Sequence, residues 1–78
     1  MSLQESLLRT ATIRSNLRLV RKCGEIAARR LSQLHDHVAE MTYSACVDLE
    51  AKLAGELLEI VGQLPELTSF QREKLVAV

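Results

Sequence analysis

Aromatic and turn-forming residues are scarce in this chain. Tyr43 and Phe70 are the only aromatic residues, tryptophan is absent, and there are three glycines and one proline among 78 residues. The apolar residues are instead chiefly leucine, alanine, valine and isoleucine. Such a composition suits packing between helices better than a β-sandwich, because strands favour aromatic and β-branched side chains. Intrinsic disorder is not expected either, since 47% of the residues are hydrophobic.

Long hydrophobic runs and paired cysteines are also absent. No apolar run approaches the roughly 20 residues that cross a membrane, and the N-terminus lacks the basic and apolar regions of a signal peptide. Cys23 and Cys46 have neither the spacing of a disulfide framework nor that of a metal site. We therefore expect a soluble, cytoplasmic protein with free thiols and with no bound metal or cofactor.

Common catalytic patterns are missing too. The chain has no glycine-rich phosphate loop, no triad spacing and no paired-carboxylate site, so we do not expect an enzyme. Residues 1–78 correspond to one small domain. A domain of this size buries only roughly 60% of its unfolded surface, so a sizeable core calls for a disulfide, a metal or a partner chain.

The chain does have a helical apolar pattern. Ser2-Leu3-Gln4-Glu5 has the form of a capping box and predicts the start of a helix. From Ile13 an apolar or small residue recurs every three or four positions for more than four heptads, which is typical of a coiled-coil-like seam. Steps of four after Ala45 indicate a stutter. The stripe consists of Ile13, Leu17, Val20, Gly24, Ala27, Leu31, Leu34, Val38, Met41, Ala45, Leu49, Leu53, Leu57, Ile60 and Leu64.

We place the break in this stripe at Gly24. Basic residues precede Gly24 and Glu25 follows it, which matches the charges favoured at the end of one helix and at the start of the next. The prediction is an antiparallel hairpin with helices over about 3–22 and 25–63. The alternative is one long bent helix in which Gly24 is a point of close packing.

A short helix is predicted after the hairpin. Gly62 and Pro65 end the long helix, and the pattern Thr68-Ser69-Phe70-Gln71 predicts a capped helix over about 69–77. The whole domain is therefore predicted to be all-α.

The unequal lengths of the two long helices predict a partner. A helix over 3–22 covers only half of one over 25–63, and the C-terminal helix is too short to bury the rest. Apolar patches left in this way are typical association surfaces. We expect a homodimer, most simply an antiparallel one with four-helix character, and a further protein partner. The residues expected at this surface are Leu49, Leu53, Leu57, Ile60, Leu64, Phe70 and Leu75.

Charge is sorted along the chain. Residues 1–30 carry seven basic and two acidic side chains, whereas residues 31–64 carry six acidic side chains and one lysine. Helical segments with net charges of +5 and −5 attract each other when they pack antiparallel, within one chain or between two. We expect the acidic stretch from Asp48 to Glu59 to be left for a neighbour, because the first helix does not reach it.

Four basic residues form a candidate nucleic-acid site. Arg14, Arg18 and Arg21 recur on one helix face with Lys22 beside them, and such a stripe can follow phosphates. The net charge of zero, the lack of an aromatic platform and the absence of a groove-reading motif argue against this use. A solvated or structural basic face is the favoured interpretation.

Both histidines lie in one cluster. Asp36 follows His35 directly, and an adjacent carboxylate can orient an imidazole as a nucleophile. His37 and Asp36 each share a helix face with Glu40, but the second motif that a di-iron bundle needs is missing. A solvated polar face is the simplest interpretation of the cluster.

The same cluster resembles the H-box of the NarL-associated class of sensor histidine kinases, in Arg29, Gln33, Leu34, His35, Asp36, Val38, Ala39 and Glu40. The resemblance implies a dimeric helical hairpin in which His35 accepts phosphate and Asp36 acts as its base. Leu31, Ser32 and the acidic Glu40 depart from the family pattern, and 78 residues leave no room for a nucleotide-binding domain.

The stretch is also similar to the second helix of the Rop-type RNA-binding hairpins, in Leu34, His35, Asp36 and His37 with Glu40 and Ser44. The likeness implies a dimeric hairpin. It transfers no RNA-binding residue, because that family's contacts lie on its first helix and the first segment here has no matching pattern.

The function we expect is that of a non-enzymatic helical module for protein–protein interaction and dimerisation, acting as a small regulator, adaptor or chaperone-like protein. Phosphotransfer through His35 and nucleic-acid binding through the basic stripe are the two alternatives.

Overall fold

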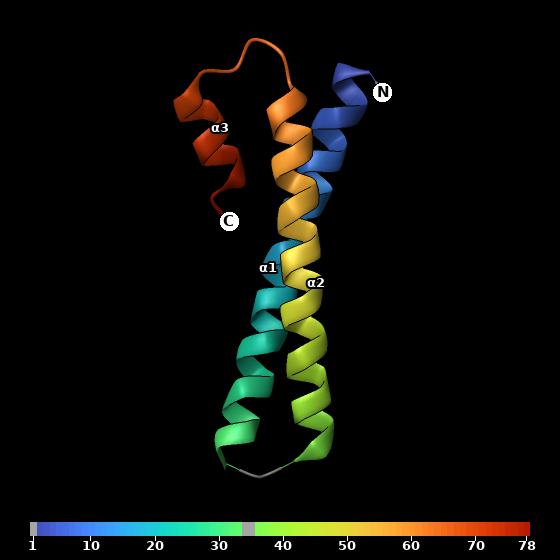
Figure 1. Cartoon of the computed structure of the whole chain (residues 1–78), viewed down its shortest axis with the longest axis vertical. Helices are drawn as coiled ribbons and strands as arrows, with labels where there is room; N and C mark the ends of the chain where they lie inside the picture. Colours follow the sequence, from blue (N-terminus) through green and yellow to red (C-terminus); the bar gives the residue numbers. More distant parts are fainter. Residues whose placement is uncertain (1, 34–35) are drawn as a thin grey trace.

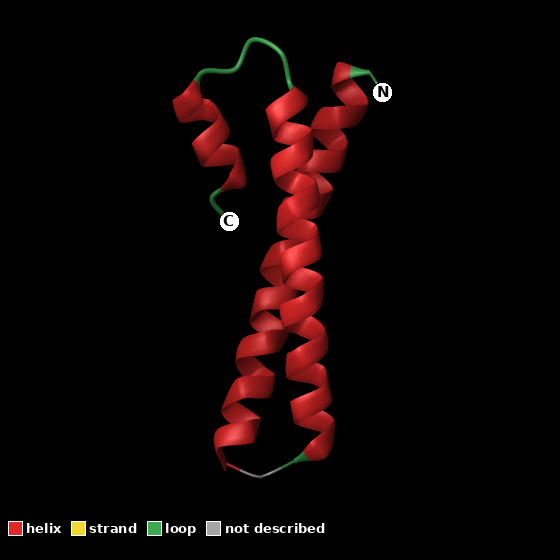
Figure 2. Ribbon diagram, in the orientation of Figure 1, coloured by secondary structure: helices red, strands yellow, loops and turns green. Residues whose placement is uncertain are grey.

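The chain folds as a helical hairpin followed by a short helix. A computed structural model describes residues 2–33 and 36–78. These ranges form three helices and no strand: α1 (Leu3–Gln33), α2 (His37–Gln63) and α3 (Ser69–Val76). α1 and α2 pack antiparallel, and α3 lies beside the end of α2 remote from the turn (Figure 1). The predicted all-α hairpin with a short C-terminal helix is confirmed (Figure 2). None of the described helices has the length and hydropathy needed to cross a membrane.

Two helix starts follow the predicted capping patterns. The N–H of Glu5 donates to Ser2 Oγ at 3.2 Å, at the start of α1. At the start of α3, the N–H of Gln71 donates to Thr68 Oγ1 and the N–H of Thr68 donates to Gln71 Oε1. This reciprocal pair is the capping box that the sequence predicts.

The predicted turn at Gly24 is wrong. α1 continues through Gly24 and ends at Gln33, and a separate helix begins at His37. The alternative of one long bent helix through residue 63 is therefore wrong as well. A glycine inside a helix costs only about 1 kcal/mol relative to alanine, which packing along a helix of 31 residues outweighs. Gly24 lies inside α1 at the seam, where a Cβ added to it would lie 3.5 Å from the Cβ of Cys46, an ordinary contact distance.

The second helix begins at a capping residue rather than at a glycine. Asp36 is the N-cap of α2, with extended backbone angles (φ −99°, ψ 117°). Its Oδ1 accepts the backbone N–H of Val38 at 3.0 Å, which satisfies one of the donors that a helix start leaves free.

The two long helices therefore have similar lengths, 31 and 27 residues. The predicted ranges 3–22 and 25–63 are wrong, and so is the conclusion that half of α2 lacks a covering helix. At a rise of 1.5 Å per residue the helices are about 46 and 40 Å long, close to the 49 Å length of the molecule. α1 can accompany α2 along its whole length.

The seam between α1 and α2 follows the predicted stripe only in part. In α1 every member of the stripe is buried or half-buried: Ile13, Leu17, Val20, Gly24, Ala27 and Leu31. Leu34 lies outside the described residues. Just after the turn the prediction is wrong, because Val38, Met41, Ala45 and Leu49 are exposed and Ala39 is buried instead. Farther along α2 it is confirmed, since Leu53, Leu57, Ile60 and Leu64 are buried or half-buried. The reversal of the chain interrupts the seven-residue register, and the successive steps of four after Ala45 turn the stripe back toward α1.

The hydrophobic core lies far from the turn. Five buried residues form it: Ile13, Leu17, Leu57, Val61 and Leu64. Partly buried apolar residues pack against it from α3 and its flanking segments, namely Leu67, Leu75, Val76 and Val78.

Arg72 ties α3 to the end of α2. Its Nη1 donates to the carbonyl of Gly62 at 3.2 Å, and its Nη2 donates to the carbonyl of Leu64 at 3.0 Å. Carbonyls at the C-terminal end of a helix lack partners within the helix and favour a nearby cation. α3 thus packs against the core and supplies polar partners to the end of α2.

Ion pairs join the basic helix to the acidic one within the chain. Arg9 and Glu56 approach to 3.7 Å, and Arg21 and Glu50 to 2.7 Å. The expectation that the acidic stretch of α2 lies beyond the reach of the first helix is therefore wrong. Because exposed pairs are typically worth about 0.2–1 kcal/mol, they favour the antiparallel orientation more than they stabilise the fold.

Candidate interaction surface

The two halves of the hairpin differ in what lies between their helices. We call residues 19–33 and 36–50 the turn half, and the remaining described residues the open half. The whole core cluster lies in the open half. Among the described residues of the turn half, only Ala27 and Ala39 are buried. α3 does not extend to this half (Figure 1). The fully buried side chains of the turn half are therefore small ones, and half-buried residues and ion pairs supply its other contacts.

An open groove of about 590 Å³ runs along one side of the turn half. Ile26 and Val38, which border it from opposite helices, are 58% and 69% exposed. Large apolar side chains thus stand beside the groove without being covered. We call it the turn-half groove; its lining is Cys23, Ile26, Ala27, Arg30, Asp36, Val38, Ala39 and Thr42.

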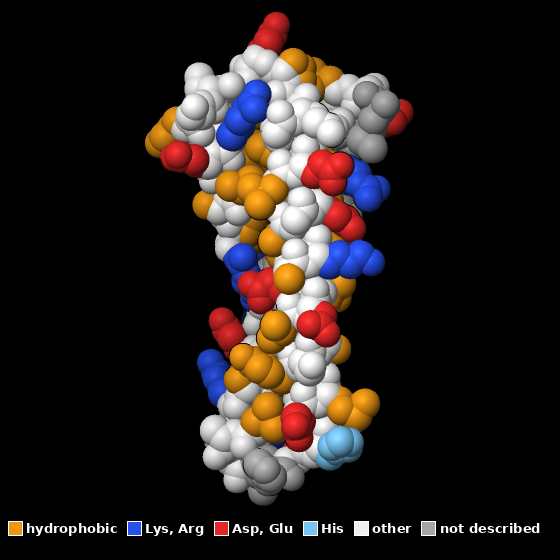
Figure 3. All heavy atoms as spheres, viewed as in Figure 1, with side chains coloured by type: hydrophobic (Ala, Val, Ile, Leu, Met, Phe, Trp, Pro, Cys, Tyr) orange, Lys and Arg blue, Asp and Glu red, His pale blue; other side chains and the backbone are white. Residues whose placement is uncertain are grey.

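The apolar surface continues beyond this groove on both helices. Leu19 lies one helical turn before Cys23, and Met41, Ala45 and Leu49 follow Val38 at steps of three and four. Space-filling atoms show uncovered apolar side chains on the lower part of the hairpin, where α3 is absent (Figure 3). We call the exposed set the turn-half face: Leu19, Cys23, Ile26, Val38, Met41, Ala45 and Leu49.

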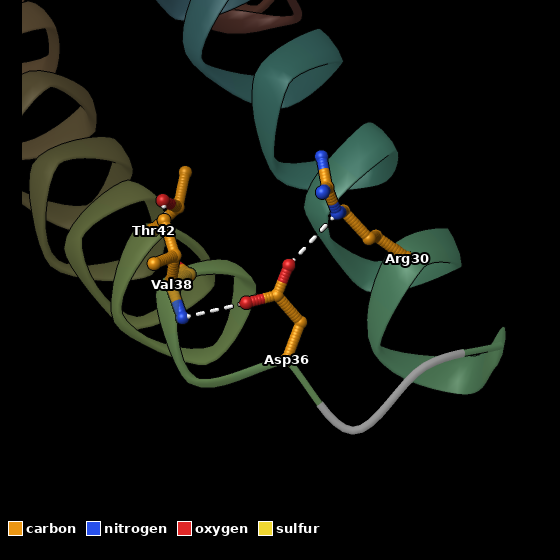
Figure 4. Close-up of polar contacts among 4 residues, drawn as sticks. All are labelled: Arg30, Asp36, Val38 and Thr42. Atoms are coloured by element: carbon orange, nitrogen blue, oxygen red, sulfur yellow. Dashed lines mark hydrogen bonds and ion pairs between the residues drawn. The ribbon is translucent and has the colours of Figure 1, made fainter.

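The polar groups that border the groove are already paired within the chain (Figure 4). Asp36 Oδ2 forms an ion pair with Arg30 Nε at 2.9 Å, while its Oδ1 accepts from the N–H of Val38. The Thr42 hydroxyl donates to the carbonyl of Val38 at 2.8 Å. Covering the groove would therefore leave the Asp36 carboxylate and the Thr42 hydroxyl with their partners, which keeps the desolvation cost low.

A second, smaller groove of about 400 Å³ flanks the other side of the seam. The Arg21–Glu50 ion pair borders it together with Glu25. Tyr43 and Val47 also line it, but its charged side chains are more numerous than those of the turn-half groove. The turn-half groove is the better candidate for apolar contact.

The predicted partner-binding residues divide into three groups. Leu57 and Leu64 are 1% and 3% exposed, so they belong to the core of this chain and are not available to a partner. Leu53, Ile60 and Leu75 are partly buried against that core. Leu49 and Phe70 are exposed, and Leu49 alone of the predicted set lies in the turn-half face. The assignment was wrong for Leu57 and Leu64 because α1 covers the stretch that was predicted to lack a partner.

The basic stripe is not a continuous free surface. Arg21 is engaged by Glu50 across the seam. Arg14 is half-buried, and its Nε atom is enclosed with no hydrogen-bond partner among the described residues. Arg18 and Lys22 are exposed. Two of the four predicted nucleic-acid residues, Arg14 and Arg21, thus lie partly inside the hairpin rather than on its free surface.

The described part of the histidine cluster lies at the start of α2. His35, the predicted phosphoacceptor, lies outside the described residues, whereas Asp36 caps α2 and pairs with Arg30. His37 is exposed at the first position of α2. Within residues 2–33 and 36–78, no three His, Cys, Asp or Glu side chains lie close enough together to hold a metal ion. Both cysteines are free thiols, Cys23 exposed and Cys46 half-buried.

Sequence reasoning placed Val38 and Met41 in the seam and thereby missed the turn-half face. A signal that would have located the turn is Asp36, a favoured N-cap residue that follows two basic residues, Arg29 and Arg30, near the end of the preceding helix. Moving the turn to this position shifts the register of α2 and exposes Val38, Met41 and Ala45.

Comparison of the chain with protein-family models, with curated proteins and with solved structures gave no match.

Proposed function

We propose that this chain is a non-enzymatic helical module for protein–protein interaction that works as a homodimer with four-helix character. The observation that supports this most directly is the turn half, where two buried alanines separate the helices and large apolar side chains remain exposed around a groove. A chain of 78 residues has little apolar surface to spare. Exposing such a face is costly unless a partner covers it.

A second copy is the simplest partner, because it brings an identical apolar face about a two-fold axis. Five large side chains of this face are exposed in each copy: Leu19, Ile26, Val38, Met41 and Leu49. Covering ten half-exposed side chains in a dimer contributes on the order of 10 kcal/mol. Association costs about 4–15 kcal/mol, so we expect a dimer of moderate affinity.

Sedimentation equilibrium of the full chain over a range of micromolar concentrations tests the proposal. We expect the wild-type chain to dimerise reversibly. Ile26→Glu and Val38→Glu should each raise the dimer Kd by at least about 100-fold, since each dimer carries the change twice and each copy loses roughly 1.4 kcal/mol or more.

The matched control is Leu58→Glu. Leu58 is 60% exposed on the same helix but lies in the open half, so this change should leave the dimer Kd within about threefold of wild type. Circular dichroism establishes that each variant keeps its helical content. A wild-type chain that stays monomeric at every concentration, or equal effects of all three variants, would contradict the proposal.

A further inference from the structure

The two helices that form the turn-half face carry net charges of opposite sign. Within residues 19–33, α1 carries four basic side chains and one acidic one, a net charge of +3. Residues 36–50, which comprise the N-cap Asp36 and the first part of α2, carry four acidic side chains and no lysine or arginine, a net charge of −4. A covering surface fits best when it places acidic groups over α1 and basic groups over α2.

Ion pairs within the chain use only part of these charges. Arg21 pairs with Glu50 and Arg30 with Asp36. Two basic side chains of α1, Lys22 and Arg29, and two acidic ones of α2, Glu40 and Asp48, form no ion pair with any other described residue. These charges remain available to a neighbour.

Two hairpins stacked face to face can be related by a two-fold axis in two ways. An axis along the hairpin places α1 of each copy over α2 of the other, with both turns at the same end. An axis across the hairpin places α1 over α1 and α2 over α2, with the turns at opposite ends. Only the lengthwise axis brings the basic helix against the acidic one, and it does so twice.

Part of the apolar face also matches in height about the lengthwise axis, which keeps every residue at its own height along the hairpin. Gly24 faces Cys46 across the seam, so residues 19–26 of α1 are level with about 44–51 of α2 when both rise by 1.5 Å per residue. Leu19 and Ile26 of one copy therefore come over the stretch of the other copy that holds Ala45 and Leu49. Val38 and Met41 come over residues 29–32 instead.

We propose that a second copy of this chain covers the turn-half groove in this alignment, with both turns at the same end and α1 of each copy lying over α2 of the other. The inference rests on the proposed function, since it specifies how the two copies of the dimer meet. The groove then receives apolar side chains, and Lys22 of one copy comes level with Asp48 of the other.

Distances between spin labels on the full chain test the alignment. In a background of Cys23→Ala and Cys46→Ala, a single label is attached in separate variants at Gln33→Cys and at Gln63→Cys. Both sites are exposed and end α1 and α2, at opposite ends of the hairpin. Sedimentation of the labelled variants gives their dimer Kd, and pulsed electron resonance is then recorded well above that concentration.

We expect both label pairs to lie within about 30 Å of each other, since each pair then spans only the width of a four-helix assembly. With the turns at opposite ends, the two separations along the hairpin add to about 78 Å whatever the overlap. At least one pair would then be about 39 Å apart or more, and a dimer with that result would overturn the alignment while leaving the proposed function intact. A labelled and an unlabelled chain that are both monomeric would overturn the proposed function itself.

Discussion

The open half and the turn half of this hairpin use the same two helices in different ways. In the open half, bulky residues of α1 and α2 close on one another, and α3 packs over them so that Leu17 and Leu57 are almost fully buried. In the turn half only alanines are buried, a glycine marks the close approach of the helices, and the bulky residues stand outside. The large buried side chains and the large exposed ones thus lie at different ends of one hairpin.

Side-chain size at the seam explains this difference. Leucine and isoleucine between two helices fill the space there and stabilise the single chain. Alanine and glycine let the backbones approach but contribute little burial, so the bulky residues of the turn half occupy the flanks instead. A short chain can in this way fold from one end and offer the other end to a partner.

The largest expected effect comes from truncating a core residue in the open half. Leu57→Ala should lower the free energy of unfolding by about 2–5 kcal/mol, because it leaves a cavity in the one cluster of large buried side chains found within residues 2–33 and 36–78. Val38→Ala, in the turn half, should change it by less than about 0.5 kcal/mol in the monomer. Urea denaturation below the dimer Kd measures both. Similar losses from the two changes would show that the halves share one core.

Removing the cap of α2 should have an intermediate effect at the turn. Asp36→Ala loses the hydrogen bond to the N–H of Val38 and the ion pair with Arg30, and should cost about 1 kcal/mol in urea denaturation. Asp36→Asn keeps a capping oxygen and should lose less than half as much. If alanine at this position costs nothing, the capping bond does not hold the turn in place.

The smallest expected effect is a gain in stability at the close approach of the helices. In Gly24→Ala the new Cβ lies at an ordinary contact distance from Cys46, so the change should stabilise the chain by about 0.5–1 kcal/mol through lower entropy of the unfolded state. Gly55→Ala, where nothing lies within 4 Å of the added Cβ, is the matched control and should give a similar gain. A loss at Gly24 alone would mean that the turn half is packed more tightly than its exposed side chains indicate.

Much of the fold was predictable because it depends on local rules. The capping pattern at Thr68, the end of α2 at Gln63 and the inward stripe from Ile13 to Leu31 follow from hydrogen bonds and periodicity within a few residues of one another. The attraction between a basic and an acidic helix was also readable from the sequence, and Arg21 with Glu50 realises it.

The position of the turn was not predictable by the same reasoning. Gly24 satisfies local rules for a helix end, yet α1 continues through it and places it opposite Cys46 in the seam. Every error about the interaction surface follows from this one choice. Moving the turn from Gly24 to the segment before His37 buries Leu57 and Leu64 and exposes Val38 and Met41.

The sequence by itself determined the class of the fold, the opposite charges of its two main helices and the start of its last helix, because each depends on composition, periodicity or hydrogen bonds between near neighbours. Only the tertiary structure decided which apolar residues face inward in α2. That choice depends on where two helices, each about 40 Å long or more, reverse direction and come into register, and the free energy that settles it is summed over the whole seam. The same total packing free energy leaves the bulky residues of the turn half exposed, and these residues form the candidate interaction surface.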